Sequence, residues 1–599
     1  MSESTHKAKG AIPFDAEKWS KSVGELAQRG WRVWMDSLKE QTESGGIQIP
    51  DPAVIGKAFM ELALKIQAEP RKLAELQAQA WGDGYRLWES TVRRLAGHPA
   101  QPVVEPESHD RRFKDAAWQE EIYFDFVKQA YLLTSRWAQS VVASVTDLEE
   151  GTAKKIDFYT RQLIEAMSPT NFAATNPKVW QEALETGGQS LLKGFENLLG
   201  DMERGEGRLA ISMTDFASFK IGENIAVTPG KVIYQNDLMQ LIQYAPATDT
   251  VCRRPLLIVP PWINKFYILD LQPKNSFIRW AVENGQTVFV ISWVNPGKEL
   301  AHKGFEDYMA EGPLAALDAI ELATGEREVN LIGYCIGGTL TASTLGYLAA
   351  KEDDRVKSAT FFTTLVDFSD VGELSVFIDD EQLHLLDKHM EAQGYLDGRL
   401  MGTVFSMLRA NDLIWSFVVN NYLLGKDPRP FDLLYWNCDS TRMPAMMHSY
   451  YLRKMYLENK LVEPGGISLK GVPIDLRAVK TPVYILSARE DHIAPWKTTY
   501  AATQLYSGPV KFVLGGSGHI AGAMNPPSAN KYGYWTNGRK PKSPDAWLNG
   551  AKEHQGSWWP DWLEWVGQFA GGSVPPREPG SGSLKALEDA PGSYVQVRC

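Results

Sequence analysis

Cysteine is scarce in this chain, and its scarcity argues against a fold built on disulfides. Four cysteines occur among 599 residues, at positions 252, 335, 438 and 599, far apart and without C-x-x-C spacing. So low a count is typical of a protein in a reducing compartment. The same spacing predicts no metal site, and no redox cofactor site is expected either.

Long apolar runs and an excess of basic residues are also missing. No stretch of about 18 uninterrupted apolar residues occurs, which argues against a transmembrane segment. The start, MSESTHKAKG, is polar and has no apolar h-region, so no secretory signal is expected and a cytoplasmic location is predicted. The formal net charge of −11 argues against nucleic-acid binding, which requires a basic surface.

Aromatic residues, by contrast, are abundant, with 20 tryptophans. In residues 14–200 the large apolar side chains recur at helical spacing, which predicts an all-α N-terminal domain over residues 1–212. Residues 200–207, GDMERGEG, replace that periodicity with glycine and charge and are interpreted as a linker. Most of the apolar stripes are expected to be buried in a helical bundle; the alternative is a surface for partners or apolar material.

From about residue 222 the pattern changes to short β-rich runs separated by helical segments, which predicts a mostly parallel sheet of about eight strands covered on both faces. This second domain is assigned to residues 213–599. A long interval, about 368–480, lacks a clear strand and is rich in aromatics, so it is expected to fold as a helical cap. The predicted strands are 225–228, 232–235, 241–244, 256–259, 287–292, 329–333, 359–365, 483–487 and 510–514.

One motif in the predicted sheet contains a candidate catalytic nucleophile. Residues 331–340, LIGYCIGGTL, place Cys335 between Gly333 and Gly337, after an apolar strand and before a helical segment. This is the nucleophile-elbow arrangement of the α/β-hydrolase fold, with cysteine in the serine position. A buried structural cysteine is the alternative, and the flanking glycines argue against it.

The other members of a catalytic triad follow in the chain order of that fold. Asp491 comes after the predicted strand at 483–487, and His519 follows the next one, behind the glycines of GGSGH. Asp367, after an earlier strand, is the alternative acid. The adjacent Glu490 is expected to point elsewhere on the turn, and His492 is interpreted as an exposed loop histidine rather than a second functional group.

The chemistry of these residue types suggests a catalytic role for each candidate. His519 would generate the Cys335 thiolate, and Asp491 would orient the imidazole. The first oxyanion donor is the backbone N–H of Ile336, and the second comes from the loop 260–264, where the two prolines cannot donate. Trp262 or Ile263 is left, and Ile263 is preferred. An acyl-cysteine stays reactive toward an alcohol, so cysteine suits transfer of an acyl group from a thioester to a hydroxyl while water is excluded.

A series of longer motifs extends the pattern from about residue 109 to the end of the chain. Through them the sequence resembles the class I polyhydroxyalkanoate synthases, acyltransferases that act on short 3-hydroxyacyl-CoA. The motifs are DRRFKDAAW, SPTNFAATNP, PPWINKFYILDLQP, GYCIGG, TTLVDFSDVGEL, NDLIW, PFDLLYWNCDSTRMP, SAREDHIAPW, GGSGHIAGAMNPP and GSWWPDW.

The resemblance implies a catalytic triad of Cys335, Asp491 and His519, and it matches Trp436 to a residue of dimer or polymer contact. It implies polymerisation of (R)-3-hydroxybutyryl-CoA or a close homologue into a polyester stored in granules, by a homodimer that needs no cofactor. Granule-associated proteins are expected partners, and the N-terminal domain is expected to serve granule or partner association. Whether Asp491 acts through His519 or directly on the substrate hydroxyl is left open. The rival functions are a thioesterase or esterase with the same triad, and a non-catalytic granule scaffold.

Overall fold

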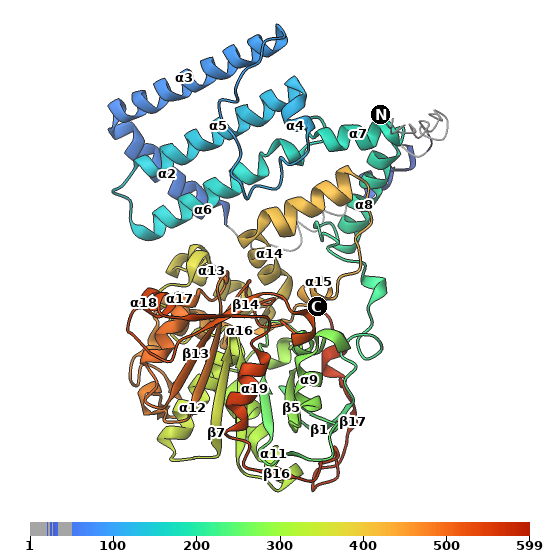
Figure 1. The fold of residues 1–599 in the computed structure, drawn as a ribbon, viewed down its shortest axis with the longest axis vertical. Coiled ribbons are helices and arrows are strands. Elements are labelled where there is room, and N and C mark those ends of the chain that lie inside the picture. Colours follow the sequence, from blue (N-terminus) through green and yellow to red (C-terminus); the bar gives the residue numbers. More distant parts are fainter. Residues whose placement is uncertain (1–20, 22–23, 27, 34–50) are drawn as a thin grey trace, which may run out of the picture. The chain divides into compact units, whose positions relative to one another are not determined.

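The computed structural model describes residues 21, 24–26, 28–33 and 51–599. The chain forms two compact units, one made of Met1–Asp215 with Val404–Arg429 and the other of Phe216–Thr403 with Pro430–Cys599 (Figure 1). Within the described part of the chain, no helix combines the length and apolarity needed to cross a lipid bilayer.

The first unit is helical, as the periodicity predicts. Asp51 caps the first of its long helices by accepting from the Ala53 N–H at 2.7 Å. The helices are α2 (Pro52–Ala68), α3 (Pro70–Leu95), α4 (Ala117–Glu120), α5 (Ile122–Ser144), α6 (Glu150–Ala166), α7 (Pro177–Glu185) and α8 (Gln189–Arg204).

The linker expected at residues 200–207 is wrong over its first half, because α8 continues to Arg204. Asp201 supplies the reason: its side chain is buried and accepts from the backbone N–H of Ser212 at 2.8 Å and from the Tyr422 hydroxyl at 2.6 Å. A charge-rich sequence therefore stays helical where its charge has buried partners.

Residues 404–429 join this unit although they lie inside the interval predicted as the cap. They include the π-helical turns η8 (Asn411–Trp415) and η9 (Val418–Leu423). At Gly194 of α8 a Cβ atom would lie 1.9 Å from the Tyr422 carbonyl oxygen, so only glycine permits this approach. The helical unit is thus assembled from two distant parts of the chain.

The second unit is built on an eleven-stranded sheet in the order β15-β14-β13-β12-β7-β6-β4-β5-β2-β1-β17. The six central strands are parallel and both edges are antiparallel. The strands are β1 (Gly230–Gln235), β2 (Met239–Tyr244), β4 (Leu256–Val259), β5 (Val288–Trp293), β6 (Val329–Tyr334), β7 (Val356–Phe362), β12 (Val483–Ala488), β13 (Val510–Gly515), β14 (Gly533–Thr536), β15 (Lys552–Gln555) and β17 (Glu588–Asp589).

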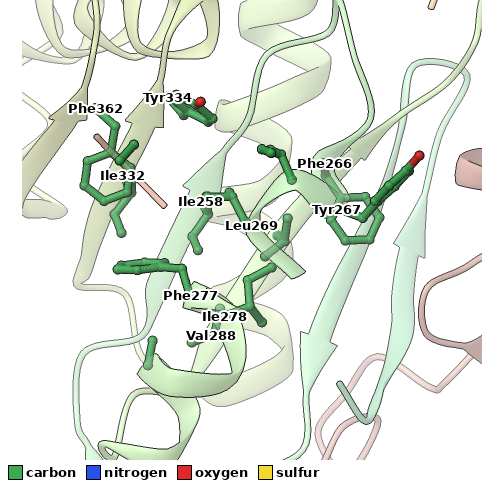
Figure 2. Close-up of a cluster of buried hydrophobic side chains, with 14 of the residues drawn as sticks. Ile258, Phe266, Tyr267, Leu269, Phe277, Ile278, Val288, Ile332, Tyr334 and Phe362 are labelled. Atoms are coloured by element: carbon green, nitrogen blue, oxygen red, sulfur yellow. The ribbon is translucent and has the colours of Figure 1, made fainter. Parts of the chain in front are cut away.

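Alternation of side chains assigns the helices to the two faces of the sheet. Ile332 and Tyr334 of β6 share one core with α9 (Phe277–Glu283) and α19 (Trp559–Gly567), part of which Figure 2 shows. The intervening Gly333 faces α12 (Ile336–Ala350), since a Cβ there would lie 2.9 Å from the Cβ of Thr341. Helices therefore cover both faces, as the sequence predicts.

Helices also fill the interval between β7 and β12, where the sequence predicts a cap. In the second unit they are α13 (Asp380–Gln393), α15 (Asp432–Asn437), α16 (Ala445–Tyr451) and the π-helical turn η10 (Leu452–Leu457), and α14 (Gly398–Leu408) leads into residues 404–429.

Two strand predictions are wrong in an informative way. Residues 225–228 form no strand: Ala226 has φ 54°, and its N–H donates to the Asp270 carbonyl at 2.8 Å. The strand expected at 359–365 ends at Phe362, because Thr363 adopts φ 43° and leaves the extended region.

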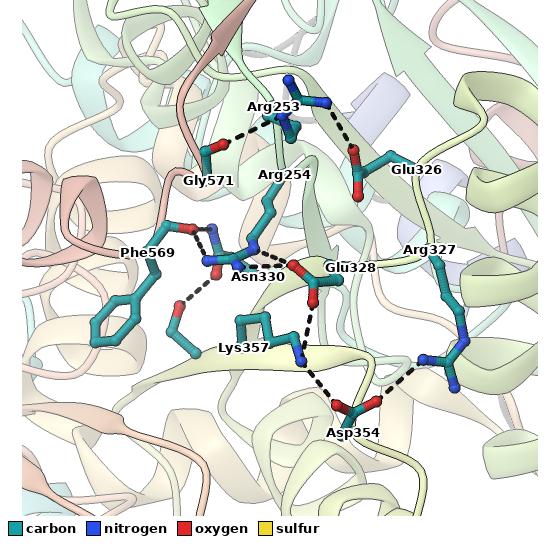
Figure 3. Close-up of polar contacts among 11 residues, drawn as sticks. Arg253, Arg254, Glu326, Arg327, Glu328, Asn330, Asp354, Lys357, Phe569 and Gly571 are labelled. Carbon is teal, nitrogen blue, oxygen red and sulfur yellow. Dashed lines mark hydrogen bonds and ion pairs between the residues drawn. The ribbon is translucent and has the colours of Figure 1, made fainter.

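An ion-pair network ties the chain after α19 to the amino-terminal edge of the sheet (Figure 3). Arg254 pairs with Glu328 at 2.6 Å and donates to the Phe569 carbonyl at 3.1 Å. Lys357 links Glu328 to Asp354, at 3.0 Å to each. The opposite, carboxyl-terminal edge is left for the loops that carry the predicted site residues.

Candidate active site

Cys335 lies on the sharp turn between β6 and α12. Its backbone has φ 51° and ψ −123°, a conformation that a residue with a side chain rarely adopts. The Cys335 N–H donates to the Phe362 carbonyl at 2.9 Å, which fixes the turn to the neighbouring strand β7. The strain therefore presents the thiol at the carboxyl-terminal edge of the sheet.

The glycines of the motif have a steric role. At Gly337 a Cβ would lie 2.4 Å from the Val259 carbonyl oxygen and 2.5 Å from that of Pro260. At Gly333 it would lie 2.6 Å from the Cα of Gly338. The elbow thus packs directly against the end of β4 and against its own helix, and no side chain fits between them.

Asp491 and His519 meet on the loops after β12 and β13. The Asp491 Oδ2 lies 2.7 Å from the Nδ1 of His519, and both side chains are buried. The other oxygen of Asp491 accepts from the N–H groups of Ile493 and Ala494, each at 2.9 Å. With Nδ1 held by the carboxylate, Nε2 of the imidazole is left for a proton from a nucleophile.

The electrostatics favour a protonated His519. Burial lowers the pKa of the imidazole, but the charge of Asp491 and that of a Cys335 thiolate, with their hydrogen bonds, outweigh it and raise the pKa well above its ordinary 6.5. A protonated imidazole beside a cysteine is the arrangement that stabilises a thiolate when one forms, and it is the pairing that activates cysteine nucleophiles.

The alternative residues lie elsewhere. Asp367 Oδ1 accepts from the Ser369 N–H and from the Asn459 side chain, both at 2.9 Å. Glu490 is exposed. Of the two acids weighed from the sequence, Asp491 is the one that reaches His519.

The two oxyanion candidates flank the elbow. Ile336 begins α12, and the first N–H groups of a helix have no partner within it. Ile263 lies in the loop after β4, which the cap residue Thr441 fixes by donating to the Ile263 carbonyl at 3.1 Å. In the described part of the chain, neither N–H donates to another protein group. Both stay predictions as oxyanion donors.

Two tyrosines of the cap, Tyr451 and Tyr456, were not found by sequence reasoning. Their rings lie 5.5 Å apart, and each has its pKa raised by burial first and then by neighbouring charge, Cys335 included. Tyr456 also contacts Phe368, at 4.9 Å between ring centroids. The cap therefore contributes a pair of neutral tyrosine hydroxyls whose pKa values respond to the charge of Cys335, and no spacing in the sequence signals them.

Trp436 is buried in the second unit, 5% exposed, and its Nε1 donates to the Lys265 carbonyl at 2.7 Å. A dimer or polymer contact by this side chain stays a prediction, and it requires the surrounding residues to move.

Comparison with known proteins gives consistent matches. A family model described as the N-terminus of poly-beta-hydroxybutyrate polymerase (PhaC) matches residues 109–281, and one described as the alpha/beta hydrolase fold matches residues 255–526. The predicted fold class is thereby confirmed. A crystal structure of a monoacylglycerol lipase from Paleococcus ferrophilus is similar at 14% identity and a TM-score of 0.29, over 47% of this chain and 90% of the lipase.

Two curated relatives match almost the whole chain. The poly(3-hydroxyalkanoate) polymerase subunit PhaC of Rhizobium meliloti is 52% identical over 531 residues, which cover 89% of this chain and 87% of the relative. The poly(3-hydroxyalkanoate) polymerase of Methylorubrum extorquens is 50% identical over 604 aligned positions, 99% of this chain and 100% of the relative.

Proposed function

This chain belongs to the poly(3-hydroxyalkanoate) polymerase family, and from that premise we propose that it polymerises short (R)-3-hydroxyacyl-CoA, chiefly 3-hydroxybutyryl-CoA, through an acyl group on Cys335. The enzyme is an acyltransferase. The observation that carries the mechanism is the strained Cys335 at the edge where the buried Asp491–His519 pair lies.

Acylation begins from the state in which the Cys335 sulfur is a thiolate and His519 carries a proton on Nε2. The thiolate attacks the thioester carbonyl, and the oxygen becomes negative while the backbone N–H groups of Ile336 and Ile263 donate to it. The C–S bond to CoA then breaks, and the imidazolium returns its proton to the leaving CoA thiolate. Cys335 is left as a thioester of the hydroxyacyl group.

Elongation uses the 3-hydroxyl of the next hydroxyacyl-CoA as the nucleophile. Its oxygen attacks the acyl-cysteine, its proton passes to His519, and the Cys335 sulfur leaves as the thiolate. Asp491 either orients His519 in this step or takes up the hydroxyl proton itself. The extended acyl-CoA reacylates Cys335 and releases CoA, so each added unit forms one ester and frees one CoA.

The aromatic cap residues support a cycle from which water is excluded. The pKa values of Tyr451 and Tyr456 are raised by burial first and in part by the charge of Cys335, and a site closed to water favours transfer to a hydroxyl over hydrolysis. The family also supports a homodimer at the surface of cytoplasmic polyester granules, with Trp436 as a contact residue and the N-terminal domain engaged with the granule or its proteins.

The experiment is to incubate the purified protein with (R)-3-hydroxybutyryl-CoA and follow free CoA with a thiol reagent and polyester by turbidity. We expect one CoA per unit polymerised, and loss of both signals in Cys335→Ala. Release of CoA with only free 3-hydroxybutyrate would instead identify a thioesterase. Retention of activity in Cys335→Ala would refute the acyl-cysteine.

A further inference from the structure

Helix α3 of the helical unit has an exposed apolar stripe that the proposed catalytic cycle does not use. Two tryptophans on it are far more exposed than is usual for this residue. The exposed fractions of its side chains are 81% for Trp81, 63% for Tyr85, 58% for Trp88, 42% for Val92 and 68% for Leu95.

The stripe is regular. Its members follow one another at intervals of four, three, four and three residues, the spacing of a coiled-coil seam, over roughly 21 Å of helix. The opposite face of α3 is the buried one, and it carries Asp83, Leu87 and Ser90. Figure 1 shows α3 lying along α5. Within the described residues, α3 packs chiefly against α5 and the stripe stays exposed.

The stripe is large for a surface without a partner. From the exposed fractions, its five side chains present roughly 600 Å² of mainly aromatic and aliphatic surface. That area is at the upper limit for the largest apolar patch of a typical monomer, about 300–600 Å². Two such faces together give about 1,200 Å², which reaches the lower limit of a specific interface.

Small residues lie along α3 beside the large ones of the stripe. They are Ala78, Gly82 and Gly84, and a Cβ at either glycine would meet no atom within 4 Å. If two α3 helices pair antiparallel, the heptad register places Tyr85 opposite Trp88, Trp81 opposite Val92 and Ala78 opposite Leu95.

The flanking positions fit the same register. Glu89, the flanking charge in the paired region, lies beside Gly82 of the second copy, so no like charges meet across the seam. We infer that α3 is a homotypic interaction surface, which pairs antiparallel with α3 of a second copy of this chain. A two-fold arrangement of this kind uses the same patch on both subunits.

A polyester surface is the other occupant to consider. An amorphous polymer requires exposed aromatic area but no heptad spacing and no matching of small against large side chains. The regular seam, and the register that sets Val92 opposite Trp81 and Ala78 opposite Leu95, therefore favour a second helix.

The test is sedimentation of the full-length protein across micromolar concentrations. Trp88→Glu should weaken self-association about thirtyfold, because exposed tryptophans at interface centres are commonly decisive. Trp81→Gln, at the most exposed position of the stripe, should weaken it in the same direction. The matched control is Leu184→Glu on α7, where the side chain is 75% exposed and lies off the stripe, and it should change nothing.

Disulfide formation tests the register. An equimolar mixture of Trp81→Cys and Val92→Cys single variants should give a disulfide-linked dimer, whereas Trp81→Cys mixed with Leu184→Cys should not. Equal cross-linking in both mixtures, or unchanged self-association in Trp88→Glu, would overturn the inference. So would a Trp88→Glu protein that associates normally but no longer binds polyester particles, since the polymer would then be the occupant.

Discussion

At the scale of single residues, the sulfur of Cys335 decides whether the acyl group can move on to another hydroxyl. An oxygen ester at this position would be more stable than the thioester, and it would also lack the thiolate that His519 stabilises. We therefore expect Cys335→Ser to lower polymer formation by about a hundredfold or more and to release mainly free hydroxy acid. The measurement is CoA release against polymer yield; a serine variant that makes polymer at the original rate would contradict it.

The Asp491–His519 pair predicts a pH dependence of stability. The folded pKa of His519 lies well above 6.5, so the folded protein holds a proton that the unfolded chain releases. The stabilisation is complete below pH 6.5 and is lost as the pH rises through the folded pKa, with a slope of at most about 1.4 kcal/mol per pH unit.

Denaturant unfolding between pH 6.5 and 9 measures this slope. In Asp491→Asn the imidazole has no carboxylate beside it, so the free energy of unfolding should become nearly independent of pH over this interval. An unchanged slope in that variant would show that another group titrates.

The sequence could single out Cys335, Asp491 and His519 because each has a local signal. Glycines surround the cysteine, and an apolar strand precedes each of the other two. Tyr451 and Tyr456 carry no such signal. Their pKa values respond to the charge of Cys335 through the tertiary fold, and tertiary packing is not encoded in a short pattern.

At the scale of elements, the contact between the elbow and β4 predicts a strict requirement for glycine. A methyl group at Gly337 would collide with backbone carbonyl oxygens that cannot turn away. Gly337→Ala should lower the free energy of unfolding by about 3 kcal/mol. Gly56→Ala, in open space on α2, is the control and should raise it by about 0.5–1 kcal/mol. Equal effects in denaturant unfolding would refute the steric argument.

A buried histidine on helix α16 of the cap predicts that the protein loses stability in acid. His448 is buried, and no partner for either ring nitrogen is found in the described structure. Burial lowers its pKa to about 4, so the unfolded chain binds a proton between pH 6.5 and 4 that the folded chain excludes. The free energy of unfolding should fall by roughly 3 kcal/mol as the pH falls through that window.

His448→Met should remove most of this dependence while leaving stability at pH 7 nearly unchanged. His98→Gln, at an exposed histidine, serves as the control and should keep the slope. If His448→Met still lost the full amount of stability in acid, another titratable group would be responsible for the pH dependence.

The same scale shows what sequence patterns can resolve. The central strands were predictable because buried parallel strands are continuous apolar runs. The edge strands β14, β15 and β17 were missed because each has only two to four residues. β15 and β17 are also polar, so their backbone pairing, rather than their side chains, defines them. The pattern likewise misplaced the end of α8, since a buried carboxylate overrides local polarity.

At the scale of the whole molecule, truncation of the chain at one point cannot remove the helical unit, because residues 404–429 also belong to it. Gly194 contacts the Tyr422 backbone, and Asn197 donates to the Asn421 carbonyl at 3.1 Å. A protein that begins at residue 216 would keep 404–429 without these contacts and should aggregate on purification. Replacing 404–429 as well with a short glycine-serine linker should restore a monodisperse species in size-exclusion chromatography; a monodisperse first truncation would contradict the argument.

Because the helical unit is built from two distant parts of the chain, it cannot be completed until late in translation. The ribosome completes residue 215 long before it reaches residue 429, and at 5–20 residues per second the wait is roughly 10–40 s. During that time the nascent helices lack the segment that α8 packs against. Chaperone demand should therefore peak between these two points of translation and decline once residue 429 has emerged.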